Sequence, residues 1–292
     1  MLKNKPVTIV FKCSQTTLGS FEDLVSKEGH EHIQREGFRH YAICQAPRII
    51  FKSFEREEEK IKIKIQRDVT EFEEISVSIV TSVIFDGVET EISHIESTNY
   101  PEIKVTLDNG IEVRFKTCFE FLGHTMQSNH DILTHEVIYI GKTKTTENYL
   151  RLKSHSKLTA IAECNLKSKP QHDIFIKLFK FDDPIFICYY DEEPVNPEWA
   201  VELIKEIGEF TPDQITNLIE AFLIRGFDTE YNDQLSKSVP NKLHDSYNFI
   251  FDKPIDTIVI NIDESNRKYL LKIGEETKRI CNFITPLQPG EK

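Results

Sequence analysis

The segment EVIYIGKTKTTENYLRLKSHSKL, residues 136–158, holds the pattern that best predicts the fold of this chain. Its first six residues are rich in β-branched and aromatic side chains and predict a short strand at 136–141. A polar turn follows, and the pattern after it predicts a helix over about 147–166. On that helix Arg151 and His155 lie four residues apart, so they share one face.

This turn and helix carry an excess of positive charge. Residues 142–157 hold five Lys or Arg side chains against one carboxylate, Glu147, which makes this window +4 in a chain of net charge −12. Lys142 and Lys144 lie on the turn that leads into the helix. A local positive pocket is what a phosphate group requires. The alternative is an amphipathic helix with a solvated basic face, on which Arg151 pairs with Glu147.

The chain beyond this helix alternates between strand and helix patterns. DIFIKLFKF predicts a strand at 173–181, and a helix is expected over about 198–210. The sequence Thr211-Pro212-Asp213-Gln214 then has the form of a capping box with Pro at the first helical position. We expect a second helix that starts there and ends at Gly226, which lacks a Cβ atom and suits a helix C-terminus.

Glu220 in this second helix is a candidate for chemistry because apolar side chains lie on both sides of it. At about 100° per residue its direction falls between those of Leu223 and Ile224. Such a carboxylate lies either at the rim of a core or inside a cleft, and a buried carboxylate needs a metal ion or another cation. After the helix, Asn232 starts an irregular segment, where Asn is most often a turn former.

The first part of the chain, up to about residue 123, has the composition and alternation of strands. IKVTL, Asp-Asn-Gly and IEVRFKT predict a β-hairpin. The acidic run EREEEK is expected to be a solvated loop, with a docking site for a basic partner as the alternative. Further strands are predicted at 7–12, 41–45, 48–54, 60–66 and 75–85.

The change of pattern near residue 130 predicts an α+β protein of more than one domain. We expect a β-rich antiparallel N-terminal domain at 1–130, a small mixed α/β domain at 131–250, and a strand-containing C-terminal extension at 251–292. YNFIF at 247–251 and TIVINI at 257–262 predict strands near the end.

Composition limits the classes of function. No apolar run reaches the roughly 18 residues of a membrane span, and no signal peptide is recognisable, so we expect a cytoplasmic protein that does not insert into membranes. The six cysteines are scattered without a C-x-x-C pair, which predicts reduced thiols and no zinc site. The net charge of −12 predicts weak, salt-sensitive binding to nucleic acid without excluding a phosphate site.

Together these segments resemble the GIY-YIG nuclease superfamily. The matching pieces occur in the order expected for that family and cover about residues 135–233. They are Tyr139-Ile140-Gly141-Lys142, Arg151-Leu152-Lys153-Ser154-His155, the strand at 173–181, Glu220-Ala221-Phe222-Leu223-Ile224, and Tyr231-Asn232.

The resemblance implies a metal-dependent endonuclease that hydrolyses phosphodiester bonds. Glu220 would bind one Mg²⁺ or Mn²⁺ ion at the scissile phosphate. Arg151 would neutralise charge on the phosphate, and Tyr139 would take a proton from the attacking water or hold that water, with Lys142 lowering its pKa. His155 would assist proton transfer or bind phosphate.

Four residues have supporting roles in this interpretation. Lys142 and Lys144 would bind phosphate, whereas Gly141 and Asn232 would order the site.

The chain departs from the family pattern in its first tyrosine, in a slightly long spacing of 12 residues from Tyr139 to Arg151, and in an extra helix expected at 198–210. Family members carry a Gly-Ile-Tyr-like strand some ten to twenty residues before the Tyr-Ile-Gly element, yet no tyrosine lies between Tyr100 and Tyr139. His135 or His124 is expected in that place, or else Tyr139 acts without a second tyrosine.

Two other functions stay open at the level of sequence. One is a catalytically degenerate GIY-YIG fold that binds or senses nucleic acid, and the other is an adaptor whose β-rich domain docks a protein. Under the nuclease interpretation we expect nucleic acid as the partner, DNA rather than RNA, with a restriction or anti-phage setting. The β-rich domain would serve a protein partner or a homo-oligomer.

Overall fold

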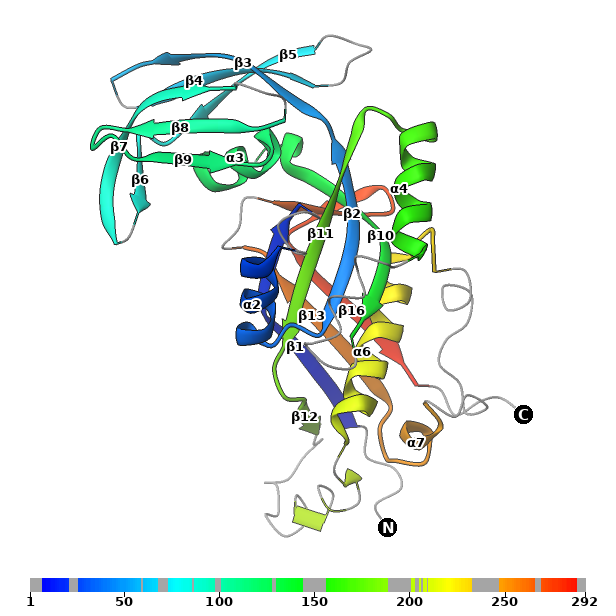
Figure 1. Cartoon of the computed structure of the whole chain (residues 1–292). Helices are drawn as coiled ribbons and strands as arrows, with labels where there is room; N and C mark the ends of the chain where they lie inside the picture. Colours follow the sequence, from blue (N-terminus) through cyan, green and yellow to red (C-terminus); the bar gives the residue numbers. More distant parts are fainter. Residues whose placement is uncertain are drawn as a thin grey trace.

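The computed structural model describes residues 7–20, 26–58, 60–67, 73–85, 87–97, 101–127, 130–143, 156–188, 201–202, 205, 207–208, 210–232, 247–265 and 269–287. These residues form a long mixed sheet with helices on both faces and a smaller β unit at one end (Figure 1). The expected mixture of helices and strands is confirmed.

The main sheet takes strands from the whole length of the chain. Its strand order is β15-β14-β10-β2-β11-β1-β13-β16, with β12 paired to the start of β1. The pairs β1–β13 and β10–β14 are parallel, and the others are antiparallel. The strands are β1 (Val7–Gly19), β2 (His40–Pro47), β10 (Thr134–Lys142), β11 (His172–Phe181), β12 (Ile185–Cys188), β13 (Thr257–Asp263), β14 (Leu270–Ile273), β15 (Glu276–Lys278) and β16 (Ile280–Pro286).

This strand order bears on the domain boundaries expected at 130 and 250. β1 and β2 come from the first expected segment, β10 and β11 from the second, and β13 to β16 from the third, yet all belong to one sheet. The structure therefore groups β1 and β2 with the Tyr-Ile-Gly strand rather than with the strands that follow them in the sequence, because strand pairing joins segments that are distant along the chain.

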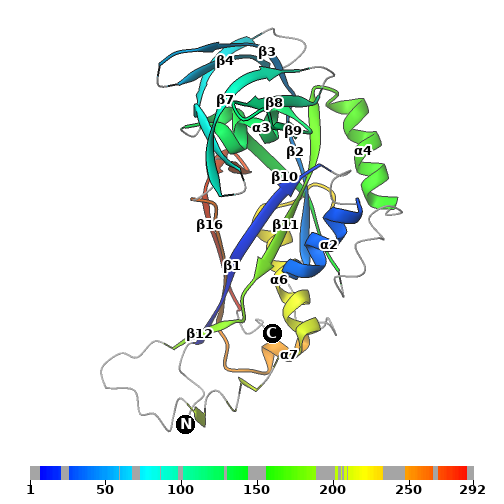
Figure 2. The ribbon, with the colours of Figure 1, turned by 60° about the vertical axis from the view of Figure 1, so that its left-hand side comes forward.

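Helices cover both faces of the main sheet. α2 (Lys27–Glu36) and α4 (Ser156–Ser168) lie on one face, where Ile33 and Ile161 pack with Ile43, Ile138 and Ile176 (Figure 2). α6 (Pro212–Phe227) lies on the other face.

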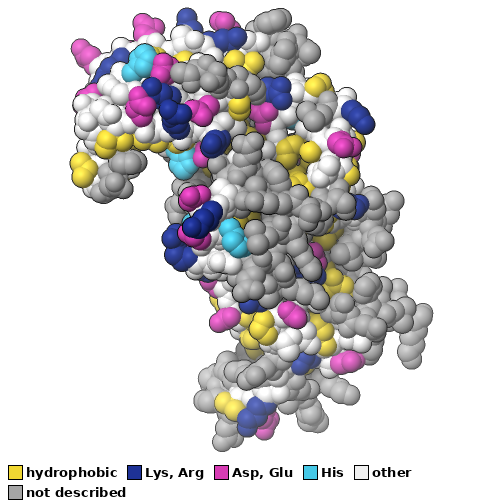
Figure 3. Space-filling model, viewed as in Figure 1, with side chains coloured by type: hydrophobic (Ala, Val, Ile, Leu, Met, Phe, Trp, Pro, Cys, Tyr) yellow, Lys and Arg dark blue, Asp and Glu magenta, His cyan; other side chains and the backbone are white. Residues whose placement is uncertain are grey.

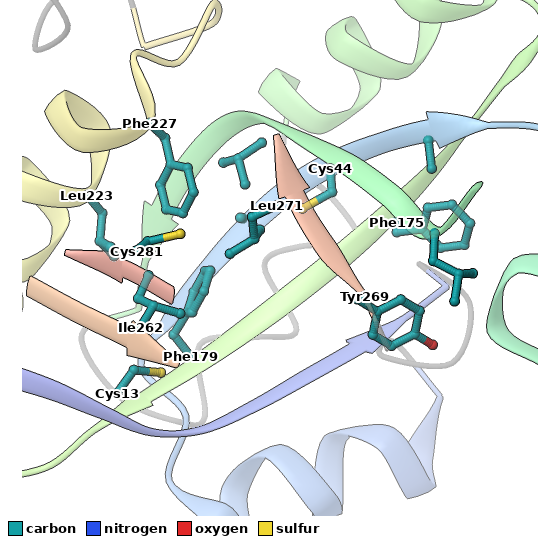
Figure 4. Close-up of a cluster of buried hydrophobic side chains, with 14 of the residues drawn as sticks. Cys13, Cys44, Phe175, Phe179, Leu223, Phe227, Ile262, Tyr269, Leu271 and Cys281 are labelled. Carbon is teal, nitrogen blue, oxygen red and sulfur yellow. The ribbon is translucent and has the colours of Figure 1, made fainter. Parts of the chain in front are cut away.

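The core under α6 is built from apolar side chains of several strands. Figure 4 shows Leu223 and Phe227 of α6 directed toward Phe179, Ile262 and Cys281 of the sheet. This packing fixes α6, which carries Glu220, against the sheet.

A β-rich unit is inserted between the paired strands β2 and β10, and we call residues 49–126 the insertion. It contains one three-stranded and one four-stranded sheet, in the orders β3-β4-β5 and β6-β7-β8-β9. Its elements are β3 (Ile49–Arg56), β4 (Ile61–Arg67), β5 (Glu73–Ile79), β6 (Ser82–Phe85), β7 (Val88–Glu96), β8 (Ile103–Leu107), β9 (Glu112–Phe115) and α3 (Cys118–Thr125). The predicted hairpin is confirmed as β8–β9. A short 3-10 helix, η1 (Asp131–Leu133), follows the insertion and precedes β10.

Several local predictions need correction. The single strand expected at 75–85 is divided between β5 and β6. The strand expected at 247–251 is a helical turn, α7 (Asn248–Phe251), because Tyr247 and Ile250 are both buried and their spacing of three residues fits a helix.

Gly226 does not end α6. The helix ends at Phe227, and Asp228 takes the left-handed conformation at φ 50°. A Cβ atom at Gly226 would lie 2.3 Å from Cγ of Phe283, so this glycine allows close packing of an aromatic ring. The expected helix at 147–166 is described only from Ser156 onward, and most of the helix expected at 198–210 lies outside the described residues.

None of the described helices is long and apolar enough to cross a membrane. The six cysteines are free.

Candidate functional site

The structure describes five of the eight candidate site residues and brings them to one end of β10. These are Tyr139, Gly141 and Lys142 on β10, Glu220 on α6, and Asn232 beyond α6. The other three, Lys144, Arg151 and His155, lie outside the described residues.

Asn232 completes the outer edge of β10. Its amide nitrogen donates to the Ile140 carbonyl at 2.9 Å, and its side-chain oxygen accepts from the Ile140 N–H at 2.8 Å. The neighbouring Tyr231 N–H donates to the Ile138 carbonyl at 3.1 Å. The Asn232 amide thus imitates a paired strand and fixes the backbone between Tyr139 and Gly141.

Glu220 and Lys142 form an ion pair between α6 and the end of β10. Lys142 Nζ lies 2.5 Å from Glu220 Oε2. Burial raises the pKa of the Glu220 carboxyl, and the nearby Lys142 ammonium offsets part of that rise. The apolar positions around Glu220 therefore produce a half-buried carboxylate that has a cation as its partner, as the helical pattern suggested.

The start of α6 is fixed by local sequence and by one contact to β2. Thr211 and Gln214 form both hydrogen bonds of the predicted capping box, which is confirmed. One turn into the helix, the Thr216 carbonyl accepts a hydrogen bond from His40 Nε2 at 3.0 Å. Since Thr216 precedes Glu220 by one helical turn, His40 ties the helix that carries Glu220 to β2.

Tyr41 is a site residue that the sequence pattern did not indicate. It lies on β2 opposite Gly141, and its ring centroid is 6.2 Å from that of Tyr139. The family pattern predicts this tyrosine between residues 100 and 139, but the insertion separates β2 from β10 and so places Tyr41 far upstream of Tyr139 in the sequence. The available signal was the predicted strand YAICQ, which begins with Tyr41.

Neither histidine expected in the place of the first tyrosine is found there. His135 is fully buried at the start of β10, where its ring contacts Phe119 and Tyr269. His124 belongs to α3 of the insertion. Tyr41 instead provides the second phenol beside Tyr139.

Gly141 has a steric reason to be glycine. The Tyr41 ring crosses the strand at this point, and a Cβ atom on Gly141 would lie 2.4 Å from Cζ of Tyr41. In the Tyr-Ile-Gly sequence, Tyr139 provides one tyrosine on β10, and Gly141 leaves space for the ring of Tyr41 from β2.

The protonation of Tyr139 differs from the expectation. Burial and the charge of Glu220 raise its pKa, and a hydrogen bond with Tyr41 lowers it in part. Lys142 is engaged with Glu220 and does not supply the expected lowering of the Tyr139 pKa. Tyr247 is also buried, and burial with the charge of Glu220 raises its pKa to about 12. Tyr139 and Tyr247 are therefore both neutral at pH 7.

The donor set fits a magnesium-type ion better than zinc. Among the described residues no group of three His, Cys, Asp or Glu side chains is placed to hold a metal ion. Mg²⁺ is commonly held by one or two carboxylates together with waters and substrate phosphate. Glu220, a single carboxylate that is paired with the Lys142 ammonium in this structure, is of the type that could hold such an ion.

A hollow of about 380 Å³ lies in the insertion, and neither Tyr41 nor Tyr139 lines it. Apart from Ser82, His124 and Thr125 its lining is apolar, with Val83, Val113 and Phe115 among the side chains. Figure 3 shows hydrophobic side chains along the lower rim of this unit and charges of both signs mixed over the rest of the visible face. Among the described candidates, Tyr139, Gly141, Lys142, Glu220 and Asn232 do not line this hollow.

The clustered residues are thus two tyrosines from adjacent antiparallel strands, a glycine that allows them to meet, and a Lys–Glu pair at the same strand end. Comparison with protein-family models, with curated proteins and with solved structures finds no match to this chain.

Proposed function

We propose that this protein is a metal-dependent endonuclease of the GIY-YIG type, with nucleic acid as its substrate. The observation that carries the proposal is the meeting of Tyr41 and Tyr139 on paired strands, with Glu220 acting electrostatically on Tyr139. Tyr41 supplies the tyrosine that was missing from the sequence motif. In the antiparallel order β10-β2-β11, the central strand β2 carries Tyr41. Its two neighbours are β10, which precedes the expected Arg151 helix in the sequence, and β11, which follows it.

In this mechanism Tyr139 orients the attacking water. Its raised pKa means that the phenol stays protonated at pH 7, so it holds the water by hydrogen bonding and is not a preformed phenolate base. The Tyr41 ring, whose centroid lies 6.2 Å from that of Tyr139, would hold the Tyr139 side chain in place. Glu220 would hold a Mg²⁺ or Mn²⁺ ion, which stabilises charge on the phosphate and on the leaving oxygen when bound. Arg151 and His155 keep their expected roles toward the phosphate.

The test is a cleavage assay on single- and double-stranded DNA and RNA, with Mn²⁺ or Mg²⁺, for the natural protein and Glu220→Gln. We expect cleavage by the natural protein and a loss of at least about a hundredfold in the variant, because the isosteric amide keeps the helix but removes the negative charge. The matched control is Glu136→Gln, a carboxylate on β10, the strand that carries Tyr139 and Lys142; the partners of Glu136 are Gln45 and Lys272. Equal rates for Glu220→Gln and the natural protein would reject the site.

A second function, binding without cleavage, is favoured by the Lys142–Glu220 ion pair. An ammonium at 2.5 Å from the carboxylate already supplies the positive charge that a metal ion would bring. No cleavage of any substrate, together with salt-sensitive binding of a labelled duplex, would support this function over the nuclease.

A further inference from the structure

Lys142 occupies the place next to Glu220 where a divalent cation is expected. The pair is partly accessible, with 24% of the Lys142 side chain and 14% of the Glu220 side chain exposed. Within the described residues Lys142 supplies the positive charge that acts on Glu220. The pair is therefore a built counter-ion arrangement rather than an incidental surface contact.

The two partners differ in their freedom to move. Glu220 lies in the middle of α6, between the buried residues Ile219 and Ala221, so its backbone is fixed. Lys142 is the last residue of β10, and its four-carbon stem can turn toward solvent without moving the strand.

Charge balance decides what happens when a cation arrives. Glu220 with Lys142 is neutral, and a divalent cation added to that pair would leave a net charge of +2 in a partly desolvated space. One phosphate group removes part of this excess and provides a new partner for the Lys142 ammonium. Binding of cation and binding of phosphate should therefore favour each other, and by the same factor.

We propose, on the basis of the nuclease function above, that Lys142 is an exchangeable counter-ion: it holds Glu220 in the cation-free protein and transfers to the substrate phosphate when a divalent cation takes its place. Through this exchange Lys142 opposes cation binding in the absence of nucleic acid. Lys142 also couples binding of the divalent cation to binding of nucleic acid.

The experiment measures Mn²⁺ binding by the electron paramagnetic resonance signal of free Mn²⁺ at pH 8, without nucleic acid. Lys142→Met should bind Mn²⁺ about tenfold more tightly than the natural protein, since its competitor for Glu220 is gone. Lys142→Arg keeps the charge and should bind Mn²⁺ within about threefold of the natural affinity. The matched control is Lys272→Met. It removes the ion pair between Lys272 on β14 and Glu136 on β10, and it should leave Mn²⁺ binding unchanged.

The coupling is measured by anisotropy of a short labelled DNA duplex in EDTA and in Ca²⁺. Ca²⁺ should tighten duplex binding by the natural protein about tenfold and by Lys142→Met less than threefold. Thermal melting confirms that each variant is folded, and Lys142→Met/Glu220→Gln, which leaves no unpaired charge, provides a second folded variant that should bind no Mn²⁺.

The outcomes separate this proposal from the function on which it rests. Unchanged or weaker Mn²⁺ binding by Lys142→Met, while Glu220→Gln abolishes binding, would overturn the counter-ion exchange and leave the metal site intact. Mn²⁺ binding unaffected by Glu220→Gln would instead overturn the metal site itself.

Discussion

At the scale of single residues, the site depends on how Gly141 and Tyr41 share space. The ring of Tyr41 lies over the backbone of β10, where any side chain at Gly141 would collide with it. The ring also lies against Tyr139, with ring centroids 6.2 Å apart, so a displaced Tyr41 would change the packing of the Tyr139 side chain. The substitution Gly141→Ala, which adds a methyl group there, therefore tests how the rings of Tyr41 and Tyr139 are placed.

We expect Gly141→Ala to destabilise the protein by about 1–3 kcal/mol, the usual cost of overpacking a close contact. In a Tyr41→Ala background the same substitution should be nearly neutral, because the obstructing ring is absent. Urea denaturation of the two single variants and the double variant gives the coupling energy. Equal costs in both backgrounds would show that the ring does not lie over Gly141.

The residue scale also shows where sequence reasoning succeeded and failed. Glu220 was identified because helical periodicity reports local burial, and the structure places it beside Lys142. Tyr41 was missed because its contact with Tyr139 depends on pairing between strands separated by the whole insertion. No local pattern in a single sequence reports such a pairing.

At the scale of elements, His40 links β2 to α6. It is fully buried, donates to the Thr216 carbonyl and meets the edge of the Phe181 ring. Burial, opposed in part by the hydrogen bond to Thr216, lowers the His40 pKa from 6.5 to about 4. The histidine is therefore neutral in the folded protein at pH 5, whereas in the unfolded chain it is mostly protonated at that pH.

This depressed pKa predicts a loss of stability in acid. The contribution of His40 to the free energy of unfolding is fully present above about pH 6.5 and is lost progressively as the pH falls toward 4. The whole change in its pKa corresponds to a loss of about 3 kcal/mol. His135, whose pKa burial also lowers, acts in the same direction. Urea denaturation at pH 7 and pH 5 should show a smaller difference for His40→Gln than for the natural protein.

The exposed His94 serves as the control for this measurement. His94→Gln should keep the natural difference between pH 7 and pH 5. If His40→Gln also keeps the natural difference in stability between pH 7 and pH 5, the buried His40 does not link the free energy of unfolding to pH.

Elements were predicted well where local signals are strong. The capping box located the start of α6, and alternation located most strands of the sheet and the insertion. α2 was missed because KEGHEHIQRE is almost entirely polar and buries only Ile33. α3 was missed because its apolar residues follow directly on the β8–β9 hairpin and continue the composition of a strand.

At the scale of the whole molecule, a buried ion pair joins two parts of the main sheet. Lys177 of β11 and Glu264, which follows β13, are 2.9 Å apart with 1% and 0% of their side chains exposed. β1 lies between these strands in the sheet, so the pair spans it. Burying two charges is costly, and each partner is needed to compensate the other.

Lys177→Met should therefore destabilise the protein by about 3–5 kcal/mol, since it leaves the Glu264 carboxylate buried and unpaired. Lys177→Met/Glu264→Gln should recover much of that loss. For comparison, Lys27→Met removes the exposed pair with Glu31 in α2 and should change the free energy of unfolding by less than about 0.5 kcal/mol. A small effect of Lys177→Met in urea denaturation would mean that the pair is not desolvated.

The chain-level organisation was the least predictable from sequence. A change of pattern near residue 130 suggested consecutive domains, but the strands at 7–19 and 40–47 belong with β10 and β11. Which strands pair is a property of the whole chain, because the same alternating pattern suits any neighbour in an antiparallel sheet. The composition of the insertion was predicted, whereas its position between two paired strands was not.

The insertion also has a consequence for the order of folding. To pair β2 with β10, the chain must close a loop from Pro47 to Thr134, and loop closure costs more entropy as the flexible length grows. Within the insertion, the contact of α3 with β3 draws its two ends together, and the bridge between Ile79 and Met126 joins its C-terminal end to its middle. We expect the insertion to fold first and to shorten the effective loop, so that the tyrosines meet only after a unit that contains neither of them has formed.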